Sequence, residues 1–452
     1  MADPFEVVAD YFKPSFFNYK IEDLYPYKVP NPFMKPMRAP ALPRIVSRYG
    51  GKGTFYDLYL PYIYNMAKAS NLKIFADCFG GGGTMAMAAL MMVDDDTHEP
   101  LFDKVIYNDV DITVVSAFEV VKDKARCEKL IDKILDTEYS EENYWEARKV
   151  SMALNLPDYD ANEWEKTDFL HSETEVRKYK AAYQITDAYI QRVLGSEKDC
   201  YSKDTIRDIV VTASKEKKRL ESGELSRDEI AFAGVVENAM SFNGDGRGFR
   251  NVDAYDRSKI DFTKKMHNAA KRFRDITPLL DRLEVRYGSY EALMEDFGDK
   301  CIYFCDPPYY KVERAAGAGN VYKHEFSVND HIRLICKLDE QKNWLLCGYK
   351  KDEQEGIREA GITEDDIKAI PEWQRRVYGV LRDMQDVIFV DLGAITRGSS
   401  SIDRGDKKSS SASSEEKETN KMEEIPPHEI LWYRQRNVLE KADQIDHETI
   451  AK

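Results

Sequence analysis

The segment that most constrains the fold is a short apolar stretch followed by consecutive glycines and a second apolar stretch. Residues 73–77 have the composition of a β-strand, residues 78–84 contain four consecutive glycines, and residues 85–93 are apolar enough to begin a buried helix. A strand, a glycine-rich turn and a helix form the ligand-binding opening of an α/β sheet, because glycines without a Cβ atom let a ligand approach the backbone. The sequence therefore predicts an α/β fold.

The glycine loop and the strand after it narrow the choice of ligand. The loop does not have Gly-x-Gly-x-x-Gly spacing, which weighs against a nicotinamide dinucleotide. The next predicted strand, residues 104–109, ends in Asp109, and Asp111 follows just beyond it. An acid at the end of the second strand is well placed to accept hydrogen bonds from both hydroxyls of a ribose. The alternative is that Asp109 caps the helix that follows.

A second candidate site follows another predicted strand, residues 301–305. This strand runs directly into Asp306, Pro307, Pro308 and Tyr309. The prolines fix φ and remove two backbone donors, so the sequence predicts a rigid extended turn with available carbonyl groups. A carboxylate and a carbonyl can accept hydrogen bonds from a planar amine while the tyrosine stacks on its ring. The alternative is a turn that only ends the strand.

A lysine between glycines precedes both of these segments. Residues 47–53 read Ser-Arg-Tyr-Gly-Gly-Lys-Gly, and a helix is expected over residues 55–69. Paired glycines and a lysine before a helix let backbone amides and a cation approach a ligand. A loop with a solvated lysine is the alternative, and the segment is not a Walker sequence.

Charge restricts any contact with nucleic acid to a local surface. The chain of 452 residues has a net charge of −15, which is not what a simple nucleic-acid coat would carry. Between residues 240 and 287, however, Lys and Arg outnumber Asp and Glu, and the glycine-rich loop 241–251 carries Asn243, Arg247 and Arg250. This window is the best candidate for a phosphate-binding surface. An ordinary loop and helix is the alternative.

Cysteine and histidine usage favours a reducing compartment and no metal. The seven cysteines include no Cys-x-x-Cys pair, and the seven histidines form no ligand-spaced cluster with them. The first thirty residues lack a basic start and an apolar run, and no stretch reaches about 18 apolar residues. We therefore expect a soluble, unexported, cytoplasmic protein without a membrane span.

The remaining segments indicate how the chain is divided. Residues 1–47 are rich in Pro and Tyr, which suits an extended N-terminal arm. The stretch from about 112 to 240 is mainly helical, and Ser226 and Glu229 have capping-box spacing. Residues 396–425 form a Ser/Lys/Glu tract that we expect to be disordered. Predicted strands on either side of this tract indicate a C-terminal hairpin with a lengthened loop.

The motifs taken together resemble the DNA adenine methylase (Dam) family of N6-adenine methyltransferases. The resemblance rests on the Gly-Gly-Lys segment, the glycine loop, the strand ending at Asp109 and the Asp-Pro-Pro-Tyr turn, in that order. The segment Phe-Asn-Gly-Asp-Gly-Arg-Gly-Phe at 242–249 is similar to a loop of the family's target-recognition region. The match covers roughly residues 48–125 and 235–435.

This resemblance implies a Rossmann-like sheet that uses S-adenosylmethionine as methyl donor, together with a mainly helical recognition and insertion domain. The catalytic domain would comprise residues 48–127 and 288–435, and the insertion and recognition region residues 128–287. Donor-binding residues would be Arg48, Lys52, Asp77, Phe79, Gly80, Gly82, Asp109 and Asp306. Catalytic residues would be Asp306, Pro307, Pro308 and Tyr309, and DNA-binding residues would be Asn243, Arg247 and Arg250. Arg48 stands where the family often has an aromatic residue.

The expected activity is transfer of a methyl group to the N6 amine of adenine in double-stranded DNA, by base flipping and direct transfer. Alternatives are N4-cytosine methylation, an RNA or free-nucleotide acceptor, and a catalytically silent DNA-binding protein with a methylase fold. The resemblance points to a bacterial or phage-infected cell. It does not tell whether a cognate restriction enzyme exists.

Overall fold

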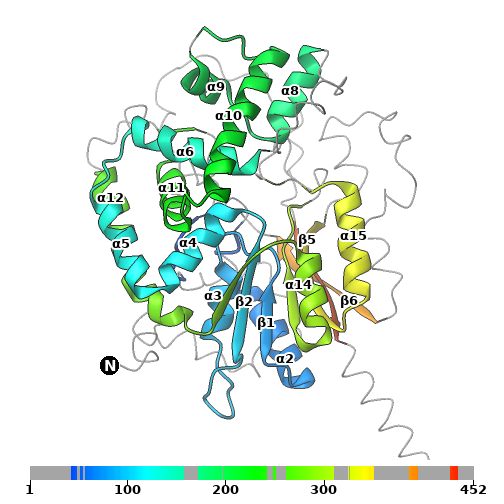
Figure 1. Cartoon of the computed structure of the whole chain (residues 1–452). Helices are drawn as coiled ribbons and strands as arrows, with labels where there is room; N and C mark the ends of the chain where they lie inside the picture. Colours follow the sequence, from blue (N-terminus) through cyan, green and yellow to red (C-terminus); the bar gives the residue numbers. More distant parts are fainter. Residues whose placement is uncertain are drawn as a thin grey trace, which may run out of the picture.

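The computed structural model is an α/β structure with one mixed sheet of seven strands (Figure 1). It describes residues 42–47, 51–53, 56–156, 172–195, 197–241, 248–250, 261–309, 324, 326–350, 386–394 and 428–435. The strands are β1 (Ile74–Asp77), β2 (Lys104–Asp109), β3 (Leu283–Tyr287), β4 (Ile302–Cys305), β5 (Asn343–Lys350), β6 (Val387–Ala394) and β7 (His428–Gln435). Their order across the sheet is β3-β2-β1-β4-β5-β7-β6.

Strand direction divides this sheet into two parts. Strands β1 to β5 pair in parallel, whereas β7 is antiparallel to both β5 and β6. The order of the parallel part, 3-2-1-4-5, is the order found in doubly wound sheets. Strands β6 and β7 pair antiparallel, as the predicted hairpin requires, and their connection, which contains the tract 396–425, lies outside the described residues.

The central strands are apolar because both faces of the sheet are covered. All four residues of β4 are buried, and they alternate as the sequence predicts. Ile302 and Phe304 join one hydrophobic cluster, whereas Tyr303 and Cys305 join the cluster on the opposite face. Because successive side chains of a strand point to opposite faces of the sheet, each residue of β4 packs into the core on one face only.

Helices on the two faces supply the rest of the core. The larger cluster includes residues from α2 (Leu60–Ser70), α3 (Thr84–Met91) and α4 (Ile112–Lys122). The smaller cluster includes residues from α14 (Tyr290–Phe297) and α15 (Val328–Asp339). Short 3-10 turns, η3 (Tyr56–Leu58) and η6 (Gly298–Lys300), precede α2 and β4. None of the helices in the described ranges is long and apolar enough to cross a membrane.

A helical region separates β2 from β3 in the sequence. It comprises α5 (Lys124–Leu135), α6 (Glu141–Asn155), α8 (Glu173–Ala182), α9 (Asp187–Leu194), α10 (Lys203–Glu221), α11 (Arg227–Met240), α12 (Phe262–Lys271), α13 (Phe273–Ile276) and η5 (Thr277–Leu280). The capping box of Ser226 and Glu229 starts α11 as predicted. The chain re-enters the sheet at β3, within the range 128–287 expected for the insertion. Strand β3 lies at the edge of the sheet and contains the charged residues Glu284 and Arg286. It therefore has no apolar run from which a strand could be predicted.

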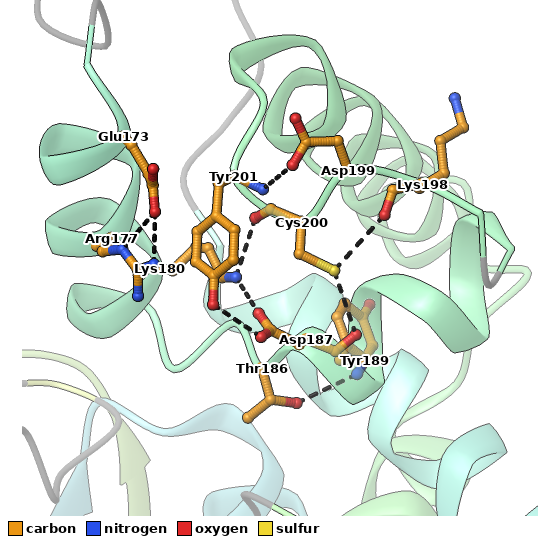
Figure 2. A network of polar contacts seen from close by, with 10 residues as sticks. All are labelled: Glu173, Arg177, Lys180, Thr186, Asp187, Tyr189, Lys198, Asp199, Cys200 and Tyr201. Carbon is orange, nitrogen blue, oxygen red and sulfur yellow. Dashed lines mark hydrogen bonds and ion pairs between the residues drawn. The ribbon is translucent and has the colours of Figure 1, made fainter.

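Polar contacts join α8 to α9 and to the start of α10, at the top of Figure 1. Figure 2 shows the ring of Tyr201 beside two cations: the guanidinium carbon of Arg177 lies 4.1 Å and the ammonium of Lys180 4.3 Å from its centroid. The Tyr201 hydroxyl donates to Asp187, 3.0 Å away, and Lys180 forms an ion pair with the same carboxylate. These contacts add to the apolar packing of the three helices, and cation–π pairs of this kind contribute about 0.5–1 kcal/mol each where exposed.

Candidate active site at the carboxyl ends of the parallel strands

Three acidic residues follow or end adjacent strands at one edge of the sheet. Asp77 and Asp109 are the last residues of β1 and β2, and Asp306 comes directly after β4. Strand β1 lies between β2 and β4: the chain runs from β1 to β2 and β3 on one side and then crosses to β4 on the other side, so the strand order reverses next to β1. Open α/β sheets bind ligands in the crevice outside the carboxyl ends of the strands, at such a switch point.

The buried Lys52 joins this edge from a segment far away in the sequence. Its ammonium lies 2.6 Å from Oδ1 of Asp306 and donates a hydrogen bond, also 2.6 Å long, to the hydroxyl of Tyr309. Lys52 is only 3% exposed, whereas the Asp306 side chain is 19% exposed. The fold thus brings three predicted site residues together, and a ligand can still reach the carboxylate.

The turn after β4 is partly covered by protein. Pro307 and Tyr309 are buried, and Pro308 is half-buried. The Tyr309 ring is 3% exposed and belongs to the larger hydrophobic cluster. The Lys52 ammonium lies 4.7 Å from the centroid of this ring. A planar ligand could therefore stack on Tyr309 only after the ring has been uncovered.

Residues of β2 hold the glycine loop in place. The Gly81 amide donates to Oδ2 of Asp109 over 2.7 Å, and the Tyr107 hydroxyl donates to the Gly81 carbonyl over 2.8 Å. A Cβ atom on Gly80 would lie 2.3 Å from the Tyr107 ring. On Gly83, where φ is +74°, it would lie 2.2 Å from Phe118. Two of the glycines are thus required by packing inside the protein, and Gly82 between them is half-buried.

The helix cap after β2 is a different acid from the one the sequence singled out. Asp111, not Asp109, is the N-cap of α4, and its carboxylate accepts from the amide of Thr113. Oδ1 of Asp109 accepts from the amide of Asp111 over 2.7 Å. The carboxylate of Asp109 therefore links the glycine loop to the start of α4.

Asp77 lies beneath the loop and is 2% exposed. Its carboxylate accepts from the amide of Ala86 in the first turn of α3, over 3.2 Å. Burial, and then the negative charge of Asp306, raise the pKa of Asp77 to about 8, and Asp109 adds to the effect. Burial therefore favours the protonated form of Asp77. Within the described part of the chain, no three His, Cys, Asp or Glu side chains are grouped so as to hold a metal ion.

An aromatic cluster that the sequence did not reveal surrounds Phe79. The Phe79 ring lies 5.4 Å from that of Tyr290 and 5.5 Å from that of Phe326, centroid to centroid. Tyr290 begins α14 and Phe326 precedes α15, so three separate segments meet at this point. Their separation in the sequence is the reason that no local pattern reveals the cluster.

The predicted recognition loop is described only at its base. Ser241 forms an isolated bridge with Phe249, and the amide of Arg250 donates to the carbonyl of Met240 at the end of α11 over 2.8 Å. The Tyr139 hydroxyl donates to the carbonyl of Arg250 at 3.3 Å. Arg250 is thus half-buried at the base of the loop. The predicted site residues Arg48, Asn243 and Arg247, and residues 1–41 of the expected arm over 1–47, lie outside the described residues.

Comparison with known proteins adds no relative to this picture. No protein-family model matches the chain, and no curated protein matches it.

Proposed function

We propose that this chain is an S-adenosylmethionine-dependent methyltransferase that modifies the N6 amine of adenine in double-stranded DNA. The observation that carries the proposal is the meeting of Asp77, Asp109 and Asp306 with Lys52 at the switch point of the sheet. The resemblance of the same segments to the Dam family supplies the identity of donor and acceptor.

The charges at this edge suit a cationic donor. Among the described residues at this edge, the carboxylates of Asp109 and Asp306 lie near one ammonium, that of Lys52, and this balance would favour a sulfonium over a pyrophosphate. The glycine loop, held by Tyr107 and Asp109, would receive the donor, and the carboxylate of Asp109 at the end of β2 would bind its ribose hydroxyls. When bound, the donor supplies a methyl group that is already activated for transfer.

The Asp-Pro-Pro-Tyr turn would orient the amine that accepts this group. The Asp306 carboxylate and the Pro307 carbonyl would accept its two N–H groups and favour a pyramidal nitrogen with an available lone pair. Lys52 already donates to Asp306, so it would fix the carboxylate while the amine binds another lone pair. Alignment of the amine with the methyl group then accounts for much of the rate.

The acceptor base would have to leave the duplex, because its amine is otherwise buried by pairing and stacking. Stacking on Tyr309 would also require a rearrangement, since the ring is 3% exposed. Cytosine carries a similar amine, so N4-cytosine methylation uses the same residues and is the nearest alternative.

The test is incubation with labelled S-adenosylmethionine and mixed-sequence duplex DNA, followed by digestion to nucleosides and mass spectrometry. We expect N6-methyladenine, reduced about 100-fold or more by Asp306→Asn, because the amide cannot act as the charged acceptor. Asp299→Asn is the matched control, since this exposed acid lies in the turn before the same strand. N4-methylcytosine would change the base, and no methylated base from the wild-type protein would refute a DNA methyltransferase.

A further inference from the structure

Helix α11 contacts the segment that carries Lys52. The side-chain amide of Asn238 accepts from the backbone N–H of Ser47 over 2.8 Å and donates to the carbonyl of the same residue. Ser47 lies five positions before Lys52. One asparagine thus satisfies both backbone groups of a residue that is 191 positions away in the sequence.

The segment around Ser47 is held at further points, so a restraint at Ser47 limits where Lys52 can lie. Ile45 and Val46 are buried in the larger hydrophobic cluster. The guanidinium of Arg44 lies so close to Gly53 that a Cβ atom on this glycine would be 2.1 Å from it. The side chain of Arg44 thus packs against Gly53, next to Lys52, and gives a second contact between the residues before Ser47 and those beside the lysine.

The same face of α11 also packs on the glycine-loop side of the site. Gly234 lies one helical turn before Asn238, and a Cβ atom there would be 2.9 Å from the side chain and carbonyl of Thr113. Thr113 is in the first turn of α4, where Asp111 caps the helix and binds Asp109. Helix α11 therefore touches the two sides of the candidate site through residues four positions apart.

Helix α11 is itself firmly placed. Glu237 forms an ion pair with Arg148 of α6, and both side chains are at most 3% exposed. The end of the helix, at Met240 and Ser241, forms the base of the predicted recognition loop. The helix is thus a rigid support shared by the loop base and by the segment that carries the lysine.

We infer that Asn238 is a positioning residue for the reaction proposed above: it holds Ser47 so that the ammonium of Lys52 reaches Asp306 and Tyr309. This inference rests on the proposed methyltransferase function. Asn238 acts through Lys52, so removal of its side chain should matter only while Lys52 is present.

A double-mutant cycle on single-turnover methylation of duplex DNA tests this relation. Loss of two neutral hydrogen bonds in Asn238→Ala should lower the rate about tenfold. Lys52→Met should lower it about 100-fold, as for removal of a charged group that fixes a reacting centre. The double variant should be no slower than Lys52→Met alone. Asn143→Ala is the matched control. The side-chain amide of Asn143, which lies in α6 and not in α11, donates to the carbonyl of Glu138 over 2.9 Å.

The possible results separate this inference from the proposed function. If the rate losses of Asn238→Ala and Lys52→Met multiply in the double variant, or if Asn238→Ala is as fast as the wild type, Asn238 does not act through Lys52. The proposed methyltransferase function would then still stand. A wild-type protein without methylation would overturn both. Asn238→Asp keeps the acceptor for the Ser47 amide, so an intermediate rate is expected if Asn238→Ala fails to fold, and a wild-type rate would again overturn the inference.

Discussion

The buried carboxyl of Asp77 makes the stability of the protein depend on pH in an unusual direction. Its pKa is raised to about 8 in the folded state, first by burial and then by Asp306. In the unfolded chain the pKa of an aspartate is about 3.9. The folded state thus binds this proton more tightly. The stabilising contribution is complete below about pH 4 and is lost as the pH rises toward 8.

Asp77→Asn isolates this contribution, because the amide has the same shape, can still accept from the Ala86 N–H and does not ionise. Between the two pKa values the wild-type protein loses about 1.4 kcal/mol per pH unit relative to the variant. From pH 5 to pH 8 the difference in free energy of unfolding should shift by roughly 2–4 kcal/mol in favour of Asp77→Asn.

The assay is urea unfolding of both proteins at pH 5, 6, 7 and 8, with Asp299→Asn as a control for removal of an exposed carboxylate. The control should differ from the wild type by the same small amount at each pH. A difference between Asp77→Asn and the wild type that does not change with pH would refute the assignment of a proton to Asp77.

Two further substitutions test the packing around the site. Gly80→Ala places a Cβ atom 2.3 Å from the Tyr107 ring, and it should cost about 1–3 kcal/mol of stability by urea unfolding; Gly288→Ala, which meets nothing within 4 Å, should leave stability nearly unchanged, and equal effects would contradict the packing explanation. Glu237→Gln leaves the Arg148 guanidinium buried without its charged partner, and it should cost about 3–5 kcal/mol by the same measurement; a loss below 1 kcal/mol would mean that water reaches this pair.

Local patterns in the sequence were sufficient for the parts of the fold that depend on neighbouring residues. The alternation in β4 and the helix cap at Ser226 follow from side-chain period and capping chemistry, and the predicted ends of β1 and β2 place Asp77 and Asp109. These features involve residues within a few positions of one another. Their physical causes can therefore be read directly from the chain.

Other features depend on partners that are distant in the sequence. The contact of Asn238 with Ser47 follows from the packing of α11 beside the sheet, which no local pattern specifies. The glycine loop illustrates a second difficulty, because Gly80 is required by Tyr107 whether or not a ligand binds. A glycine in the sequence does not tell whether a ligand or the protein itself occupies the space of the missing side chain.

The position of β7 has a consequence for how the chain is made. Strand β7 is the last strand in the described sequence, yet it lies between β5 and β6 and supplies the pairing partner of both. Since His428 lies 78 positions after the end of β5 at Lys350, a ribosome needs about 4–16 s to reach β7 after it completes β5. During that time the outer edge of β5 offers unpaired backbone groups, a state that favours association between nascent chains. Proteolysis of ribosome-bound chains of increasing length would show protection of β5 only after β7 has emerged.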